Sequence, residues 1–232
     1  MDSAATPIPG FIARWFNGLQ PLALDEATPD PAQAAVFSVD MVMGFCATGK
    51  LASERVGRLA QPVAELFQRA YQHGIRHFVL LQDAHDLQAP EFGAFPPHCI
   101  RGTEESATIP QLQVLPFSGL FTIIEKNSLH PALGTGFDQW LDEHRQVRTA
   151  LVAGNCTDLC VYQLAMHLRL RANALNYHDY QVIVPANAVD TYDLPEDMAQ
   201  QSGSYAHPGD LFHQILLYHM ALNGIRVVRE LV

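Results

Sequence analysis

The sequence predicts an α/β fold: a six-stranded, mostly parallel sheet flanked by helices in three layers. Two observations lead to this prediction. Six short apolar runs alternate along the chain with segments of helical spacing, and continuous apolar runs are typical of parallel strands that are covered on both faces. Hydrophobic residues also make up 48% of the 232 residues. That proportion is enough to bury a large core and excludes a disordered chain.

The chain divides into an N-terminal arm, residues 1–34, and a single domain, residues 35–232. The arm is rich in proline and alanine, and the apolar piece at residues 11–19 predicts one short helix within it. The strands of the domain are expected at residues 35–39, 77–82, 121–125, 148–153, 177–184 and 225–229. Helices are expected at residues 54–72, 137–144, 157–172 and 211–223.

Capping residues support the helix assignments. Ser53 precedes the first helix of the domain and Gly74 follows it, and both residue types are typical of those positions. Thr157 or Asp158 is expected to cap the helix after the fourth strand. The stretch at residues 84–117 contains five prolines and has no helical or strand period. A loop of that length inside a compact domain is usually functional.

Reactive side chains follow the predicted strands. Asp40, Asp83 and Lys126 come directly after the first three strands, and Cys160 lies at the start of the helix after the fourth. Ligands of open α/β sheets bind outside the carboxyl ends of the strands. The sequence therefore predicts that these four side chains meet at one edge of the sheet.

Three of these residues suit nucleophilic catalysis. Unpaired amides at a helix N-terminus stabilise a thiolate at Cys160, and a nearby Lys126 would lower the pKa of the thiol further. Asp40 can take the thiol proton. Each residue alone has a structural interpretation as a packed cysteine, a turn-capping acid or a solvated lysine, but their conjunction favours a catalytic centre. The tight turn Gly154-Asn155-Cys156 is a place where backbone amides can surround an oxyanion.

A second group suits metal binding. Asp83 and His85 point to the same side of an extended chain because side chains alternate, and His98 follows in the long loop. Carboxylate oxygen and imidazole nitrogen suit a borderline divalent ion such as zinc, iron or manganese. The D-x-H pattern alone also occurs by chance, and Asp86 next to it is interpreted as a solvated loop acid.

Composition excludes several classes of partner. The chain carries 24 acidic and 14 basic residues, a formal charge of −10, and shows no basic stripe, so we expect no nucleic-acid binding. No run approaches the roughly 18 apolar residues that span a bilayer, and the start lacks a secretory pattern, so we expect no membrane association. The four cysteines, at positions 46, 99, 156 and 160, form no disulfide framework. We therefore expect reduced thiols and a cytoplasmic location.

Three segments together are similar to a known family. The sequences GNCTDLCV at residues 154–161, QDAH at residues 82–85 and FPPHCIRGT at residues 95–103, with Lys126 after a strand, resemble the isochorismatase-like cysteine hydrolases and, within them, the nicotinamidase-like branch. The resemblance covers about residues 36–232. It implies the following roles: a catalytic triad of Asp40, Lys126 and Cys160; metal ligands Asp83, His85 and His98; an oxyanion hole from the amides of Cys156 and Cys160; a cis peptide between Asn155 and Cys156; and a substrate ring held between Phe45 and Phe95.

The chain departs from the family pattern at several positions, and the proline and histidine that the family usually has shortly after His85 are missing. Val42 and Gly44 stand where the first motif of the family has glutamine and aspartate, and Ala84 and Phe95 replace tryptophans of the metal segment. These changes leave the implied triad and ligands in place and alter the wall of the pocket.

The resemblance implies a metal-containing cysteine amidohydrolase. It would hydrolyse a small planar carboxamide of the nicotinamide type to the acid and ammonia through a thioester. It would bind one divalent metal ion, for which zinc is preferred over iron or manganese. It would also form a homo-oligomer, either a dimer or a tetramer. Three alternatives stay open: another amidase of the family with a maleamate- or ureido-type substrate, a zinc hydrolase in which Cys160 is structural, and an impaired member that acts as a binding protein.

Overall fold

A computed structural model describes residues 8–232 of the chain. Its centre is a seven-stranded sheet in the order β3-β2-β1-β4-β5-β7, with the two-residue strand β6 paired to β4. All of these pairings are parallel. The strands are β1 (Ala34–Val39), β2 (His77–Asp83), β3 (Phe121–Lys126), β4 (Thr149–Asn155), β5 (Gln181–Pro185), β6 (Val189–Asp190) and β7 (Arg226–Val228). The predicted α/β class is confirmed, and one strand more than predicted is present.

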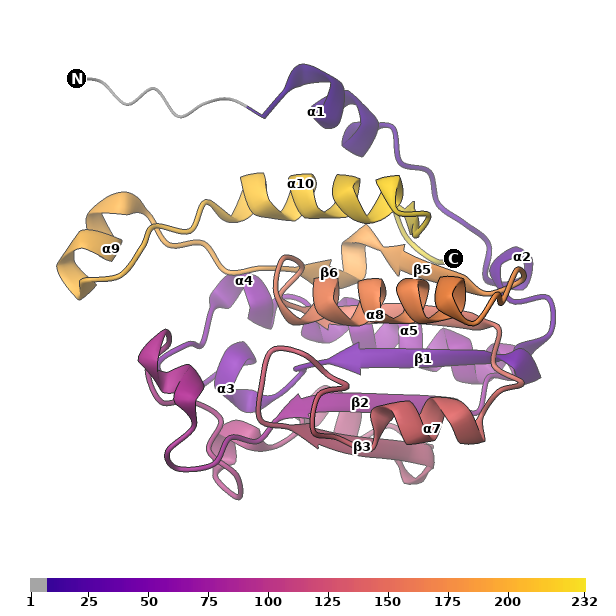
Figure 1. The fold of residues 1–232 in the computed structure, drawn as a ribbon, viewed down its shortest axis with the longest axis horizontal. Coiled ribbons are helices and arrows are strands. Elements are labelled where there is room, and N and C mark those ends of the chain that lie inside the picture. The colour runs from indigo at the N-terminus through magenta and orange to yellow at the C-terminus, as the bar shows by residue number, and fades with distance from the viewer. Residues whose placement is uncertain (1–7) are drawn as a thin grey trace.

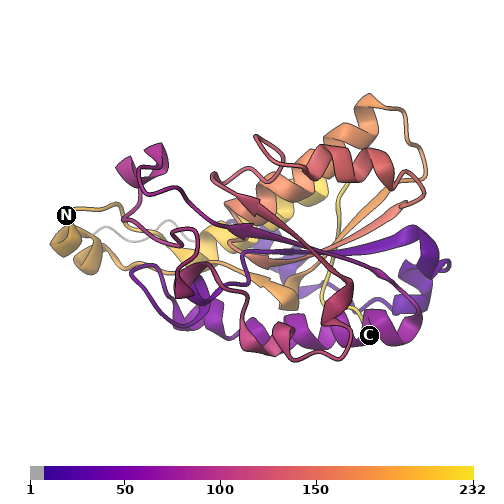
Figure 2. The same cartoon turned by 90° about the horizontal axis from the view of Figure 1, so that it is seen from below.

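Helices cover both faces of the sheet, as Figure 2 shows. α5 (Ala60–His73) packs on one face with a core cluster that includes Val63, Leu66 and Phe67. α7 (Phe137–Glu143), α8 (Cys160–Ala174) and α10 (Gly209–Leu222) contribute to the second cluster on the other face. The shorter helices are α1 (Gly10–Asn17), α2 (Leu24–Ala27), α3 (Met43–Cys46), α4 (Glu54–Gly57), α6 (Pro110–Gln113) and α9 (Glu196–Ser202). The chain thus forms the three predicted layers.

Some boundaries differ from the prediction. The helix expected at residues 54–72 is divided into α4 and α5 around Arg58 and Leu59, and the Ser53 side chain makes no capping hydrogen bond to any described residue. Gly74 ends α5 with φ of +113°, a conformation that glycine adopts readily. The fifth strand begins at Gln181, because the amide of Tyr177 bonds to the carbonyl of Ala172 and closes the end of α8.

The described part of the N-terminal arm lies on the domain. Trp15 and Phe11 of α1 make edge contacts with the ring of Tyr218 of α10, at centroid distances of 5.2 and 5.7 Å. Figure 1 shows α1 beside α10. Farther along, Leu22 pairs in parallel with Leu231. Residues 1–7 of the predicted arm lie outside the described residues.

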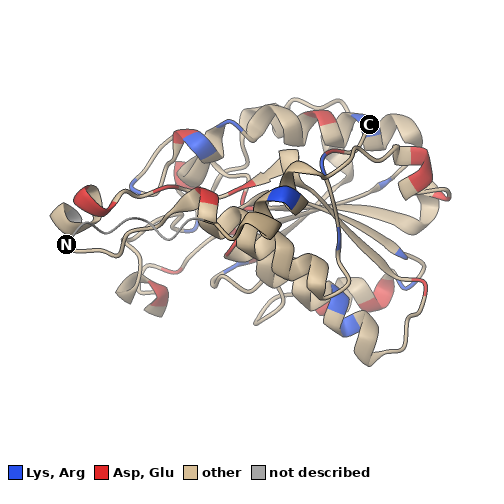
Figure 3. Ribbon diagram, turned by 90° about the horizontal axis from the view of Figure 1, so that it is seen from above, with Lys and Arg blue, Asp and Glu red and all other residues tan. Residues whose placement is uncertain are grey.

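The arrowheads of β1 and β2 point to the same side of the molecule (Figure 1). Asp40 follows β1, and Asp83 at the end of β2 stands in register with Lys126 at the end of β3. The predicted reactive residues therefore lie at the carboxyl edge of the sheet. Blue Lys and Arg segments alternate with red Asp and Glu segments over several elements (Figure 3). Within residues 8–232, none of the helices has the length and apolar character needed to cross a membrane.

Candidate active site

Asp40, Lys126 and Cys160 meet at the carboxyl edge of the sheet. The ammonium nitrogen of Lys126 lies 2.8 Å from Asp40 Oδ2 and 3.5 Å from Cys160 Sγ, and it also donates to Asp83 Oδ1. Asp40 is 0%, Lys126 1% and Cys160 4% exposed. A single buried cation therefore contacts the thiol and two carboxylates.

Backbone hydrogen bonds fix Asp40 in this position. Its own amide bonds to the carbonyl of Leu81, and its Oδ1 accepts from the amide of Asp83 at 2.8 Å. Asp40 has φ of +53°, in the left-handed region, which aspartate visits more readily than most residues. Both bonds come from β2, so the end of β2 determines where the carboxylate of Asp40 points.

Gly154 brings the turn before Cys160 close to Asp40. It has φ of +115° and a Cβ at this position would collide with the backbone of Val39, so only glycine allows β4 to approach β1 this closely. The side chain of Asn155 then donates to the carbonyl of Asp40 at 2.7 Å. The Asn155–Cys156 peptide is cis, as the family resemblance implied.

The turn of residues 157–159 is held by side-chain contacts that differ from those predicted. α8 begins at Cys160, with Leu159 rather than Thr157 or Asp158 at the N-cap. The Thr157 hydroxyl lies 2.9 Å from Nδ1 of His213, and Asp158 Oδ2 lies 2.8 Å from Nε2 of His207. Both side chains therefore tie the turn to the α9–α10 region, and the helical cap prediction is wrong.

The electrostatics of the group also differ from expectation. Burial, with a further contribution from the charge of Asp83, raises the pKa of Asp40 to about 6, although Lys126 opposes the shift. Burial opposes the charge of Lys126, but Asp40 and Asp83 raise its pKa well above the usual value, so it is an ammonium ion. Burial also raises the pKa of Cys160, and the carboxylates of Asp40 and Asp83 add to the effect of burial despite the nearby lysine. The predicted lowering of this pKa is therefore wrong, and the resting group is a thiol that needs a base.

A pH dependence follows from this arrangement. If Asp40 is the base that accepts the proton of Cys160, it must be ionised, and its pKa is about 6. Below that pH the carboxyl is protonated and cannot act as a base, so kcat/KM is expected to rise as pH increases through about 6. The measurement is a kcat/KM profile from pH 4.5 to 9, with protein stability monitored at each pH. A profile that is flat from pH 5 to 7 would contradict the assignment of Asp40 as the base.

Asp83, His85 and His98 also meet, and Glu91 joins them. One ligand atom of each of these four residues lies within 4.8 Å of all the others. His85 Nε2 is 3.5 Å from Asp83 Oδ2 and 3.7 Å from Glu91 Oε1. These three atoms are buried and have no hydrogen-bond partner among the described residues. Buried polar atoms are normally paired, so this set fits a divalent cation.

The ring of His98 is oriented for such an ion. Its Nδ1 lies 2.8 Å from the carbonyl oxygen of Pro96, which can only accept a hydrogen bond, so Nδ1 carries the proton. Nε2 then presents its lone pair 3.9 Å from Asp83 Oδ2. A backbone carbonyl that holds a histidine in its ligating tautomer is a common feature of metal sites.

Sequence reasoning missed Glu91. It lies in the single-turn helix Pro90–Gly93, and its other oxygen accepts from the amide of Leu129 at 3.1 Å. The only available signal was an acid in the long loop between His85 and His98. That signal is weak because Asp86 is an equally plausible acid in the same loop, yet its side chain is 70% exposed and faces Arg101 at 3.7 Å.

Aromatic rings surround His98. The centroids of Phe45 and Phe95 lie 5.4 and 6.3 Å from its ring, and Phe92, which the sequence analysis did not select, lies 5.7 Å away. The glycine at position 44 is enforced by packing, because a Cβ there would lie 2.5 Å from Cys99 Sγ. The two predicted substrate-binding phenylalanines thus flank a predicted metal ligand.

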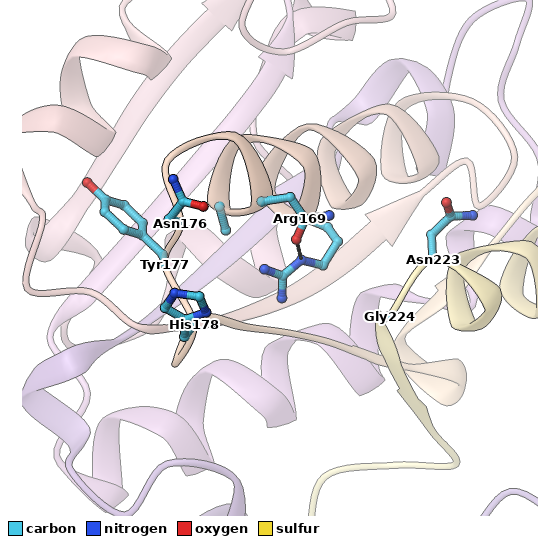
Figure 4. A pocket seen from close by; sticks show the side chains of 8 residues that line it. Arg169, Asn176, Tyr177, His178, Asn223 and Gly224 are labelled. Carbon is cyan, nitrogen blue, oxygen red and sulfur yellow. Dashed lines mark hydrogen bonds between the residues drawn. The ribbon is translucent and has the colours of Figure 1, made fainter.

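A cavity of about 410 Å³ lies away from the group of reactive side chains (Figure 4). Its lining includes Arg169, Tyr177, His178 and Gly224, near the amino ends of β5 and β7. The guanidinium of Arg169 already donates to Asn173 and to the carbonyl of Tyr180. The reactive residues lie at the opposite edge of the sheet, so we place the candidate active site there.

Comparisons with known proteins show the family to which the chain belongs. The isochorismatase domain family matches residues 34–205. Nicotinamidase 1 of Arabidopsis thaliana is 31% identical over 210 residues, which cover 83% of this chain and 84% of that protein. The structure of nicotinamidase PncA from Bacillus subtilis is 25% identical with a TM-score of 0.66, covering 84% of this chain and 99% of that one. The pyrazinamidase of Pyrococcus horikoshii in complex with zinc has a TM-score of 0.63 at 20% identity, covering 85% of this chain and 99% of that one, and it shows likeness of fold alone.

Proposed function

The chain belongs to the isochorismatase family of hydrolases and is nicotinamidase-like, and on that premise we propose that it hydrolyses a small planar carboxamide to the acid and ammonia. The observation that carries the proposal is the position of Lys126 Nζ, 3.5 Å from Cys160 Sγ and 2.8 Å from Asp40 Oδ2. This geometry supports Cys160 as the nucleophile and Asp40 as its base, with one cation next to both.

The chemistry follows from these residues. Asp40 takes the proton of Cys160, and the sulfur attacks the amide carbon to form a C–S bond. We assign stabilisation of the resulting oxyanion to the amides of Cys156 and Cys160. Asp40 returns its proton to the departing nitrogen, the C–N bond breaks and ammonia leaves. Water then hydrolyses the thioester, with Asp40 as the base, and restores the thiol.

Lys126 keeps the charge balanced during these steps. Negative charge moves from Asp40 to Cys160 Sγ when the proton is transferred, and the ammonium lies within contact of both atoms before the transfer. The environment therefore requires little reorganisation as the thiolate forms.

Asp83, His85, His98 and Glu91 are the residues that would hold a divalent ion, for which we propose zinc, with iron or manganese as alternatives. When bound, the ion supplies a Lewis-acidic anchor for a lone pair on the substrate. Asp83 links this group to the nucleophile, because its Oδ1 accepts from Lys126 while its Oδ2 lies near both histidines.

We expect metal binding to depend on His98. Replacing His98 by alanine removes one buried ligand atom and is expected to lower the metal content of the purified protein by at least about tenfold at a fixed metal concentration. Metal analysis of the wild type and the variant measures this. The control is His167→Ala. Nε2 of His167 lies 2.8 Å from Asp138 Oδ1, and His167 is not one of the four residues of this cluster. Equal metal content in the wild type and His98→Ala would remove His98 from the site.

An ammonia-release assay tests the proposed reaction. We expect activity with a planar aromatic carboxamide such as nicotinamide or pyrazinamide, because Phe45, Phe92 and Phe95 lie around His98. We expect less activity with anionic amides such as maleamate, because Arg101 is already paired with Glu125 and faces Asp86. A preference for maleamate or a ureido acid would transfer the chain to another amidase class of the family. The absence of turnover with nicotinamide, pyrazinamide, maleamate and a ureido acid would contradict the proposal.

The cytoplasmic location and the assembly into a dimer or tetramer stay predictions from the sequence.

A further inference from the structure

Asn127 connects the end of β3 to the candidate metal site. It directly follows Lys126, and its side-chain oxygen Oδ1 lies 3.1 Å from His85 Nδ1 and 3.0 Å from the amide nitrogen of Asp86. Its Nδ2 is 3.4 Å from a carboxylate oxygen of Asp86. The chemistry assigned so far does not use this residue.

The two contacts of Oδ1 determine where the proton of the His85 ring lies. The amide of Asp86 can only donate, so the atom that it contacts must be the oxygen of the Asn127 side chain rather than the nitrogen. An amide oxygen can only accept, so Nδ1 of His85 must be the donor. In the neutral ring, Nε2 then carries the lone pair.

That lone pair points into the candidate metal site. His85 Nε2 is buried, has no hydrogen-bond partner within residues 8–232, and lies between Asp83 Oδ2 and Glu91 Oε1 at 3.5 and 3.7 Å. The backbone of His85 is also held, because its amide donates to the carbonyl of Cys99 and its carbonyl accepts from the amide of Arg101. The remaining freedom of the side chain is limited by Asn127.

We propose that Asn127 is a positioning residue that holds His85 in the tautomer and orientation that bind a divalent cation through Nε2. This inference rests on the metal site of the proposed function. It makes the end of β3 the support for two ligands, because Lys126 donates to Asp83 Oδ1 and Asn127 accepts from His85. Hydrogen-bond partners of this kind orient metal ligands, and their loss typically weakens metal affinity about 10- to 100-fold.

The first test measures metal affinity. Asn127→Leu has a similar size and no acceptor, whereas Asn127→Asp keeps an acceptor oxygen, and Ser128→Ala is a neighbouring control. The dissociation constant for Zn²⁺ is measured by competition with a chelator. We expect Asn127→Leu to bind about 10- to 100-fold more weakly, and Asn127→Asp and Ser128→Ala to bind close to wild-type strength. Wild-type affinity in Asn127→Leu would overturn the proposal.

A second test does not depend on metal. In metal-free protein at alkaline pH, where the imidazole is neutral, ¹⁵N NMR shows which ring nitrogen of His85 carries the proton. We expect Nδ1–H in the wild type and a shift toward Nε2–H in Asn127→Leu. Nε2–H in the wild type would overturn the role of Asn127. A wild type that shows Nδ1–H but binds no Zn²⁺ would overturn the metal site of the proposed function, and with it the ligating role assigned to His85, while the Asn127 contact itself would stand.

Discussion

Replacing Cys160 by serine is expected to abolish amide hydrolysis and to leave the divalent ion bound. A serine hydroxyl is a much weaker acid than a thiol, and Asp40, with a pKa of about 6, is too weak a base to ionise it. We expect kcat to fall by a factor on the order of 10⁴ or more, the scale on which removal of a catalytic nucleophile acts. Ammonia release gives kcat, and metal analysis of the same sample shows whether the ion is retained.

The matched control is Cys46→Ser. Cys46 is half-buried in α3 and is not part of the Asp40–Lys126–Cys160 group, so it has no nucleophilic role in the proposed mechanism. This variant is expected to keep wild-type activity. If Cys160→Ser kept both its metal and substantial activity, a metal-bound hydroxide would be the nucleophile, and Cys160 would be structural.

Replacing Lys126 by methionine is expected to affect both activity and stability. The substitution leaves the buried carboxylates of Asp40 and Asp83 without their shared cation. Loss of one partner of a buried ion pair costs about 3–5 kcal/mol, and the thiolate loses its counter-ion as well. We therefore expect no measurable turnover and a free energy of unfolding in urea that is lower by about that amount.

Lys50→Met is the control, because Lys50 is the other lysine of the chain and is exposed. Its free energy of unfolding is expected to stay within about 0.5 kcal/mol of the wild type.

The sign of the pH dependence of stability gives a second check on Lys126→Met. Protonation removes the charge of the stranded carboxylates, so the loss of stability must be smaller at pH 5 than at pH 8. An equal loss at both pH values would point to lost packing rather than to uncompensated charge.

The fold was predictable where apolar runs are long. β1, β2, β3 and β4 lie within one or two residues of their predicted ranges. β1, β2 and β4 are buried almost throughout, and such a parallel strand needs a continuous apolar sequence. β3 lies at the edge of the sheet and is largely exposed, but its apolar run is long enough to mark it. β6 consists only of Val189 and Asp190, which is too short to produce a period. The start of β5 was misplaced because Tyr177 and Tyr180 have side chains typical of strands, and no local pattern shows that they form a turn.

The candidate site was predictable where residues follow strands. Asp40, Asp83 and Lys126 meet because parallel strands end at a common edge, which the strand order guarantees. Asn127 was missed because its contact with His85 joins segments about 40 residues apart in the chain. Glu91 was missed because Asp86 is an equally plausible acid in the same loop. The error in the pKa of Cys160 has a physical cause as well. A helix N-terminus and a lysine are visible in the sequence, but complete burial beside two carboxylates is a property of the tertiary structure.

The pairing between residues 17–24 and residues 229–232 determines when the N-terminal segment can dock as the chain is synthesised. Leu22 and Leu24 donate to the carbonyls of Glu230 and Val232, and the guanidinium of Arg229 donates to the carbonyl of Leu19 across a separation of 210 residues. Segments made early by the ribosome therefore stay without their partners until residues 229–232 have emerged. Closure of contacts this far apart in sequence is slow and leaves partly folded chains exposed in the meantime. The N-terminal segment therefore cannot complete its docking before residues 229–232 have left the ribosome, and Leu22 and Leu24 lack these partners until then.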